Sequence, residues 1–338
     1  MAGRGIIGGH AFVRHGSRSG RPDAMSPRHG HLLCLDPHGF HRIAYAEWGE
    51  RFNPHVVVCV HGLTRNSRDF DFLAMALARH CRVVCMDVAG RGDSDWLEDK
   101  ADYGFPLYLS DAATLIAHVT APAPEGPGTF LRRLLARERP PRLDWIGTSM
   151  GGLIGMMLAS KAGTPIRRLV LNDVGPLVPW SGLARLKGLH ARRKDRFRDL
   201  QEVEAHLRAA CASFGPLDDA KWRHVARHSA RQLEDGSYAL AYDPGIVSAL
   251  RNHNTEGIEF GTDFLMGVDL WPVWDAVRCP TLVLRGAESD LLLASTAREM
   301  AQRGPQARVL EFPGVGHAPW LMTEDQIGVV REFLLAED

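Results

Sequence analysis

The sequence predicts an α/β fold with a mostly parallel sheet, because short apolar runs alternate with amphipathic stretches from about residue 31 onwards. The most apolar run covers residues 56–60 (VVVCV) and lies between Pro54 and Gly62, as expected of a strand buried on both faces. Strands that alternate with helices form βαβ units, in which helices cover both faces of the sheet.

We expect about eight strands in this sheet. The first two, residues 31–36 and 41–48, flank Pro37-His38-Gly39 and predict a hairpin. Later strands are expected at residues 56–60, 82–86, 143–147, 168–171, 281–284 and 309–312. Apolar residues at helical spacing predict helices over residues 67–80, 107–119, 150–162 and 325–335.

The alternation stops between about residues 177 and 262, where helical patterns continue without a strand pattern. This stretch predicts a helical cap, residues 177–262, inserted after the sixth strand, so that the core consists of residues 31–176 and 263–338. A Pro- and Arg-rich segment, residues 121–142, predicts a surface loop with a helical piece over residues 130–137. Residues 1–30 are expected to form a disordered leader; a transit peptide and a native start at Met25 are the alternatives.

Composition and charge exclude several classes of protein. The 40 basic and 40 acidic residues cancel, so no overall field attracts nucleic acid, an anionic membrane or acidic substrates. No run approaches the ~20 apolar residues of a membrane span. The six cysteines form no zinc-binding spacing and are interpreted as buried free thiols of a reducing compartment, so cytoplasm is the default location. We therefore expect a small-molecule substrate, with no cofactor and no metal, and leave homo-oligomerisation open.

One motif points directly to chemistry: Gly147-Thr148-Ser149-Met150-Gly151 follows a predicted strand and opens a predicted helix. A serine on so sharp a turn holds a strained backbone conformation that lifts its hydroxyl above the sheet. The flanking glycines are needed because larger side chains would collide across the turn. The motif in this context predicts Ser149 as a nucleophile.

Acyl transfer to such a serine generates an oxyanion, which needs two preorganised N–H donors. We expect these donors to be the backbone amides of Met150, directly after the nucleophile, and of Leu63, in the loop after the most apolar strand. The side chain of His61 in the same loop is expected to bond only to backbone. A glycine-rich stretch, residues 87–94 (DVAGRGDS), lacks the Lys-Ser/Thr of a P-loop and the spacing of a dinucleotide site, and is interpreted as a structural turn.

Five segments in register resemble one superfamily: HGLTRNS, DVAGRGDSDW, GTSMGG, LRGAESD and GVGHAP. Together they are similar to the α/β-hydrolase superfamily, and more narrowly to its bacterial capped members, the esterases, enol-lactonases and ring-cleavage-product hydrolases. The resemblance covers roughly residues 31–176 and 263–338, and the insertion matches the usual position of a cap domain. It implies the α/β-hydrolase fold.

In this family the acid follows the strand after the cap, and the histidine lies in the last loop. The resemblance therefore implies Asp290 as the acid and His317 as the base, in the chain order of this fold. Two rivals for the acid remain. Glu288 lies in the same loop as Asp290, and Asp173 follows the preceding strand, an alternative acid position used by some members.

These residues predict a serine hydrolase that cleaves a carboxylic ester or lactone of a small, largely apolar substrate. His317 takes the proton from Ser149, Asp290 fixes the histidine tautomer, and water releases the acyl group. The alternatives are a carbon–carbon hydrolase of ring-cleavage products, which Thr148 disfavours because asparagine is usual there, and a ligand receptor or pseudoenzyme. Serine at the elbow disfavours dehalogenases and epoxide hydrolases, which carry aspartate.

Candidate substrate-binding residues are less specific. Arg65, two residues past Leu63, is a candidate polar group of the pocket, with a loop-bracing ion pair as its alternative. Trp180 and Trp320, like Trp271 and Trp274, are candidates for apolar lining or for core packing. A basic cluster in the insertion is expected to form a solvated helix face, with Arg185 facing a substrate carboxylate as the alternative.

Overall fold

The computed structural model describes residues 26–121, 141–182, 184, 194–246 and 267–337. Its centre is an eight-stranded sheet in the order β1-β2-β4-β3-β5-β6-β11-β12. The strands are β1 (Arg28–Asp36), β2 (Gly39–Trp48), β3 (His55–Val60), β4 (Arg82–Met86), β5 (Arg142–Thr148), β6 (Ile166–Asn172), β11 (Thr281–Gly286) and β12 (Arg308–Phe312). β2 is antiparallel to β1 and to β4, and the other neighbours are parallel, which confirms the predicted sheet.

The first strand begins inside the predicted leader. Arg28 pairs with Glu47 of β2, and its guanidinium donates to the Glu47 carboxylate at 2.6 Å. The assignment of residues 28–30 to a disordered leader is therefore wrong, because strand pairing extends the hairpin toward the N-terminus. Residues 1–25 of that leader, the helical piece over residues 130–137 and Arg185 lie outside the described residues.

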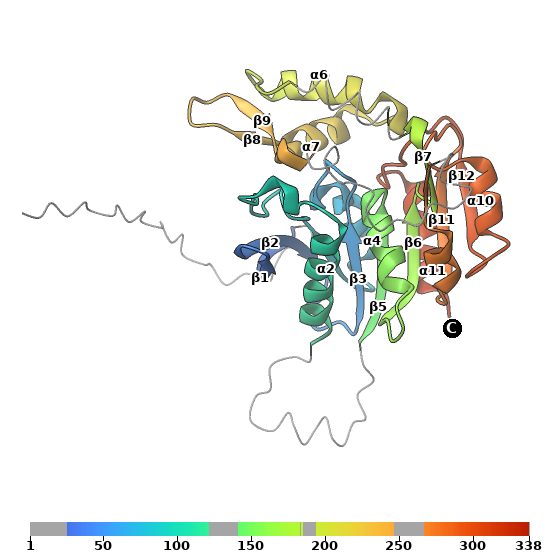
Figure 1. Ribbon diagram of the computed structural model, residues 1–338. Helices are drawn as coiled ribbons and strands as arrows, with labels where there is room; N and C mark the ends of the chain where they lie inside the picture. Colours follow the sequence, from blue (N-terminus) through green and yellow to red (C-terminus); the bar gives the residue numbers. More distant parts are fainter. Residues whose placement is uncertain (1–25, 122–140, 183, 185–193, 247–266, 338) are drawn as a thin grey trace, which may run out of the picture.

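Helices cover both faces of the sheet (Figure 1). One face packs against α2 (Phe105–Thr120), α4 (Met150–Ala159) and α9 (Trp271–Ala276), and the other packs against α1 (Asp71–Leu77) and α11 (Glu324–Leu335). Alternate residues of β3 enter the two cores: Val58 lies in the first apolar cluster and Val57 in the second. The continuous apolar run in the sequence arises because both faces of this strand are buried.

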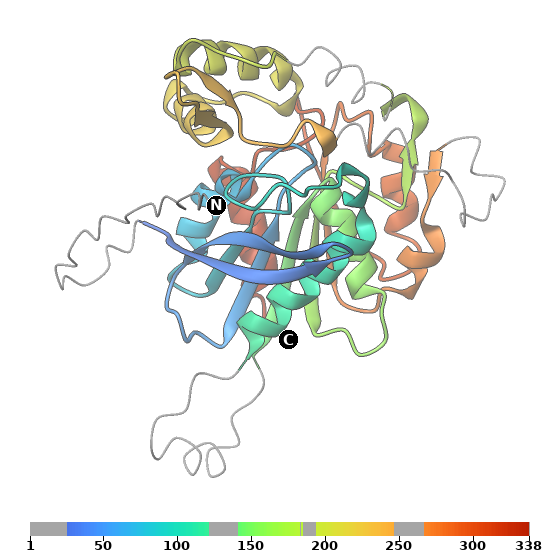
Figure 2. The ribbon, with the colours of Figure 1, turned by 60° about the vertical axis from the view of Figure 1, so that its left-hand side comes forward.

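The insertion between β6 and β11 lies over one end of the sheet (Figures 1 and 2). It contains β7 (Leu177–Pro179), α6 (Leu200–Ala210), α7 (Asp219–Ser229), β8 (Ala230–Gln232), β9 (Tyr238–Leu240) and β10 (Gly267–Asp269). The predicted helical character is present in α6 and α7. Its four strands are three residues long, too short to produce a visible period in the sequence. The described residues also form the 3₁₀ turns η1 (Ser67–Phe70), η2 (Lys100–Asp102) and η3 (Ala212–Phe214) and the short helix α10 (Ala294–Met300).

Backbone contacts join the insertion to the core at several points. Gly92 donates to the carbonyl of Ala241 at 2.9 Å, and Gly316 donates to the carbonyl of Ser213 at 2.6 Å. Asp243 of the insertion accepts from Lys100 at 2.6 Å and from the Tyr103 hydroxyl at 2.8 Å. These bonds fix the insertion above the carboxyl ends of the parallel strands. Among the described residues, no helix combines the length and the apolar character needed to cross a lipid bilayer.

Candidate active site

Ser149 occupies the turn between β5 and α4. Its φ of 51° and ψ of −114° are a strained conformation for a residue with a side chain. A Cβ at Gly147 would lie 2.2 Å from the carbonyl oxygen of Gly151, and a Cβ at Gly151 would lie 2.0 Å from that of Val60. Both glycines of the motif are therefore required by close backbone packing, for the reason that the sequence indicates.

His317, in the loop after β12, connects Ser149 to a carboxylate. Its Nε2 lies 2.9 Å from Ser149 Oγ, and its Nδ1 lies 2.7 Å from Asp173 Oδ2. Asp173 is completely buried and His317 nearly so. The three side chains form a continuous hydrogen-bonded row in which Nδ1 donates to the carboxylate and Nε2 can accept the serine proton.

The acid that faces the histidine is Asp173, and the prediction of Asp290 for this contact is wrong. The reason is the strand order: β6 lies directly beside β5, and Thr148 pairs with Asn172. The residues that follow this pair, Ser149 and Asp173, therefore leave adjacent strand ends. The Nδ1 atom of a histidine carries one hydrogen, and Asp173 accepts it.

The loop in which we expected the acid supports Asp173 instead. Gly286 donates its backbone N–H to Asp173 Oδ1 at 2.8 Å, and the Ser289 hydroxyl donates to Oδ2 at 2.6 Å. Asp290 is half-buried just after this serine, and Glu288, the other rival, is exposed. Charge-assisted hydrogen bonds of this kind fix the orientation of a buried carboxylate.

The two predicted oxyanion donors belong to segments that adjoin Ser149. Met150 is the first residue of α4, and Leu63 lines the same cavity as Ser149 and His317. A Cβ on Gly62 would lie 3.7 Å from Ser149 Cβ, so this loop runs past the nucleophile. Within the described part of the chain, neither the Leu63 nor the Met150 N–H donates to a backbone carbonyl, which leaves both free to bind an oxyanion.

Arg91 links both donor segments, and the sequence did not single it out. Its side chain is fully buried, and Nε donates to the Leu63 carbonyl at 2.8 Å. Nη1 donates to the Tyr108 hydroxyl at 3.0 Å, and Nη2 lies 3.7 Å from Met150 Sδ. The only sign of this role in the sequence was an arginine between two glycines in the loop after β4. That loop folds as a turn, as we expected.

His61 bonds to backbone on both sides, as predicted. Val88 donates its N–H to His61 Nε2 at 3.0 Å, so Nδ1 carries the proton and donates to the Gly62 carbonyl at 2.7 Å. Burial lowers the pKa of His61 to about 3, although its bond to Gly62 opposes this. The ring is therefore neutral and holds the Leu63 loop against β4.

A cavity between core and insertion opens onto Ser149 and His317. The insertion contributes an apolar wall, Leu207, Ala210, Cys211, Phe214 and Leu240, together with the polar residues His206, Ser229 and Tyr242. The core contributes Thr64, Arg65, Thr148 and Ala318 beside the residues already described. The arrangement can hold an acyl chain along apolar side chains with its carbonyl at the two free amides.

Arg65 lines this cavity and also makes the ion pair that was its alternative. Its Nε donates to Asp69 Oδ2 at 2.8 Å, and Nη2 donates to the other carboxylate oxygen. Its guanidinium carbon lies 5.4 Å from the centroid of the Trp320 ring. Burial opposes the charged form, yet the Asp69 carboxylate raises the pKa of Arg65 above its usual value, so the side chain remains charged.

The tryptophans lie behind the cavity or away from it. Trp320 is buried against Phe214 and Trp222, with ring centroids 5.0 and 5.5 Å apart. It therefore supports the wall and does not line the cavity. Trp180 is 39% exposed and is not among the residues that line the cavity. Trp271 and Trp274 belong to the core, so none of these three side chains lines the cavity.

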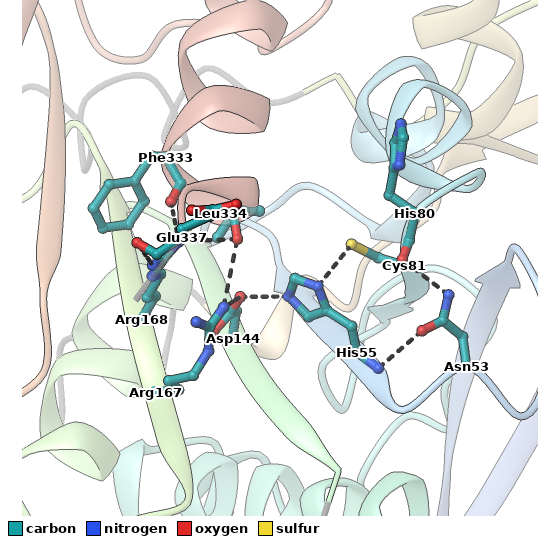
Figure 3. A network of polar contacts seen from close by, with 10 residues as sticks. All are labelled: Asn53, His55, His80, Cys81, Asp144, Arg167, Arg168, Phe333, Leu334 and Glu337. Atoms are coloured by element: carbon teal, nitrogen blue, oxygen red, sulfur yellow. Dashed lines mark hydrogen bonds and ion pairs between the residues drawn. The ribbon is translucent and has the colours of Figure 1, made fainter.

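A second row of similar chemistry lies at the opposite, amino ends of the strands (Figure 3). Cys81 Sγ lies 3.4 Å from His55 Nδ1, and His55 Nε2 lies 2.6 Å from Asp144 Oδ2. Burial raises the pKa of Cys81 to about 12, so its thiol is not a nucleophile. Arg167 donates to the same carboxylate at 3.0 Å and Arg168 to the Phe333 carbonyl at 2.6 Å, so this network joins α11 to the sheet.

Comparison with known proteins identifies the family of this chain. The model of the alpha/beta hydrolase family matches residues 57–332. The chain is 42% identical over 313 residues to the 3-hydroxybutyrate-oligomer hydrolase of Cupriavidus necator, covering 92% of this chain and 98% of that protein.

Two solved structures have a similar fold. A putative hydrolase from Rickettsia typhi matches with a TM-score of 0.77 at 26% identity, covering 93% of this chain and all of that one. An alpha/beta hydrolase from Novosphingobium aromaticivorans matches with a TM-score of 0.71 at 32% identity, covering 91% and 98%. The chain therefore belongs to the alpha/beta hydrolase family.

Proposed function

We propose that this chain is an ester hydrolase that cleaves short 3-hydroxybutyrate oligomers through an acyl-enzyme on Ser149. The observation that carries the chemistry is the row in which Ser149 Oγ lies 2.9 Å from His317 Nε2 and His317 Nδ1 lies 2.7 Å from Asp173. The substrate class is supported by the 42% identity to a 3-hydroxybutyrate-oligomer hydrolase over nearly the whole of both chains.

The proposed mechanism begins with proton transfer from Ser149 to His317 as the serine oxygen attacks the ester carbonyl. The amides of Leu63 and Met150 hold the oxyanion, and Asp173 stabilises the imidazolium that has formed. The imidazolium then protonates the departing alcohol. Water, deprotonated by the same histidine, attacks the acyl-enzyme and releases the acid.

The cavity suits this substrate chemically. Each 3-hydroxybutyrate unit presents a methyl branch, every unit except the last presents an ester carbonyl, and the last unit of a free oligomer ends in a carboxylate. The apolar wall from the insertion, which includes Leu207, Phe214 and Leu240, can pack against the methyl groups. Arg65 lines the same cavity with a guanidinium that Asp69 binds through Nε and Nη2, so Nη1 is available to a terminal carboxylate.

The test measures hydrolysis of the 3-hydroxybutyrate dimer, trimer and tetramer by chromatographic detection of the released monomer. Short p-nitrophenyl esters, a lactone and a dienoic diketone serve as competing substrate classes. The proposal predicts turnover of the oligomers with kcat/KM above that for each competing class, and no turnover by Ser149→Ala. Efficient cleavage of the diketone with no oligomer hydrolysis would instead support the carbon–carbon hydrolase reading.

A further inference from the structure

We propose that His224, His228 and Asp71 bind one divalent transition-metal ion, such as Zn²⁺, where α7 of the insertion contacts α1 of the core. This site is separate from the catalytic row and has no part in the proposed ester hydrolysis. One potential ligand atom from each of the three side chains lies within 4.8 Å of the other two.

The spacing of these atoms suits a small ion. His224 Nε2 lies 3.5 Å from Asp71 Oδ2, and tetrahedral zinc with bonds of about 2.0–2.1 Å holds its ligand atoms about 3.3 Å apart. His224 and His228 are four residues apart on α7, so their rings share one face of the helix, with centroids 4.5 Å apart. A His228 nitrogen lies within 4.8 Å of both of the other ligand atoms.

The ligand types favour a first-row transition ion over calcium or magnesium. Two imidazoles and one carboxylate suit zinc, copper and nickel, whereas calcium and magnesium prefer oxygen ligands. Three protein ligands leave one coordination position for water.

Arg68 is the competitor for this ion. Its guanidinium donates to the Asp71 carboxylate at 2.6 and 2.9 Å, and its carbonyl accepts from His224 Nε2 at 3.0 Å. The incoming cation replaces the guanidinium at Asp71 and takes the His224 nitrogen from the carbonyl. Removing the Arg68 charge should therefore tighten metal binding, which a purely structural role for the cluster does not predict.

Metal binding would brace one wall of the cavity. Asn66 in the core donates to the His228 carbonyl at 2.8 Å, and the next residue, Ser229, lines the cavity. An ion held by α7 and α1 adds a bond across the same contact. Because the ion binds the folded chain, it raises the melting temperature.

The experiment uses the full chain, purified without a polyhistidine tag and freed of metal with a chelator that is then removed. Zinc chloride is titrated by isothermal calorimetry, and melting is followed by circular dichroism with and without zinc. We expect one ion per chain, a dissociation constant in the micromolar range and a zinc-dependent rise in melting temperature. His224→Gln and His228→Gln should each weaken binding at least tenfold.

Two further variants sharpen the result. Arg68→Gln should bind zinc several-fold more tightly, whereas His80→Gln, an exposed histidine near the end of α1, should bind as the wild type does. If a histidine variant fails to fold, Asp71→Asn replaces it. Zinc affinity that is unchanged in the folded ligand variants, or the absence of a saturable single site, would overturn the proposal. Calorimetry needs no substrate, so this outcome is independent of the ester hydrolysis.

Discussion

Exchange of Asp173 for asparagine should abolish most of the activity without unfolding the chain. Asp173 accepts from Gly286 N, from the Ser289 hydroxyl and from His317 Nδ1. An asparagine has one acceptor oxygen and one NH₂ group. With the oxygen kept toward Gly286, its NH₂ faces His317 Nδ1, which must then accept. The histidine proton moves to Nε2, and this nitrogen can no longer receive the proton of Ser149.

The expected loss in kcat is about 10³–10⁴-fold, because the wrong tautomer removes the general base while the oxyanion donors remain. At 1.36 kcal/mol for each factor of ten, this is about 4–5.5 kcal/mol of transition-state stabilisation. The assay is initial-rate hydrolysis of p-nitrophenyl butyrate, with circular dichroism to verify the fold.

Asp290→Asn is the matched control, because it makes the same chemical change in the loop that the sequence favoured. The Asp290→Asn substitution should lower kcat less than about tenfold, since the acceptor for His317 Nδ1 is Asp173 and not Asp290. Equal losses in the two variants, or a folded Asp173→Asn enzyme that keeps a tenth of its activity, would refute the assignment of Asp173.

Three further predictions follow from contacts around the site. Burial lowers the pKa of His61 in the folded chain to about 3, so below pH 6.5 the unfolded chain binds more protons, and the free energy of unfolding falls as the pH falls toward 3. Urea unfolding at pH 7 and at pH 4 should show that the wild type loses about 3 kcal/mol more of this free energy than His61→Gln does. Equal losses in the two proteins would contradict this. Arg91→Lys should lower kcat about 10–100-fold with little change in KM, because the carbonyl of Leu63 loses a fixed donor; a rise in KM alone would argue against this positioning role. Arg65→Gln should raise KM about tenfold for a 3-hydroxybutyrate dimer with a free carboxylate but not for its methyl ester, and equal effects on both would contradict carboxylate binding.

The fold could be predicted because its signals are local and repeated. A strand buried on both faces, such as β3, is apolar throughout, and helices between strands show their own spacing. Ser149 and His317 could be predicted from the sequence as well, since the serine turn requires glycines at neighbouring positions and the histidine lies in a recognisable last loop. The three-residue strands of the insertion were missed because they are shorter than any detectable period.

The acid could not be chosen from the sequence because two aspartates follow neighbouring strands. Asp173 follows β6 and Asp290 follows β11, and only the order of strands in space shows that β6 lies beside the strand that carries Ser149. The loop after β11 is still part of the site, since it donates two hydrogen bonds to the acid. The resemblance thus located the correct loop and assigned it the wrong role.

The substrate-facing residues were the least predictable. Trp320 is close in sequence to His317, yet the ring that lines the cavity is that of Phe214, which packs against Trp320. The position of η3 against the last loop depends on tertiary bonds such as that between Gly316 and Ser213, which no local pattern encodes. Arg91 was overlooked for a related reason, because its partners belong to loops distant in the sequence.

Detection of the acyl-enzyme tests the central claim most directly. The enzyme is mixed with the 3-hydroxybutyrate trimer, quenched in acid on the millisecond scale, digested and analysed by mass spectrometry. The account predicts an acyl group built of 3-hydroxybutyrate units on the peptide that contains Ser149, and none in Ser149→Ala. Turnover of the trimer with the acyl group on another residue would contradict it.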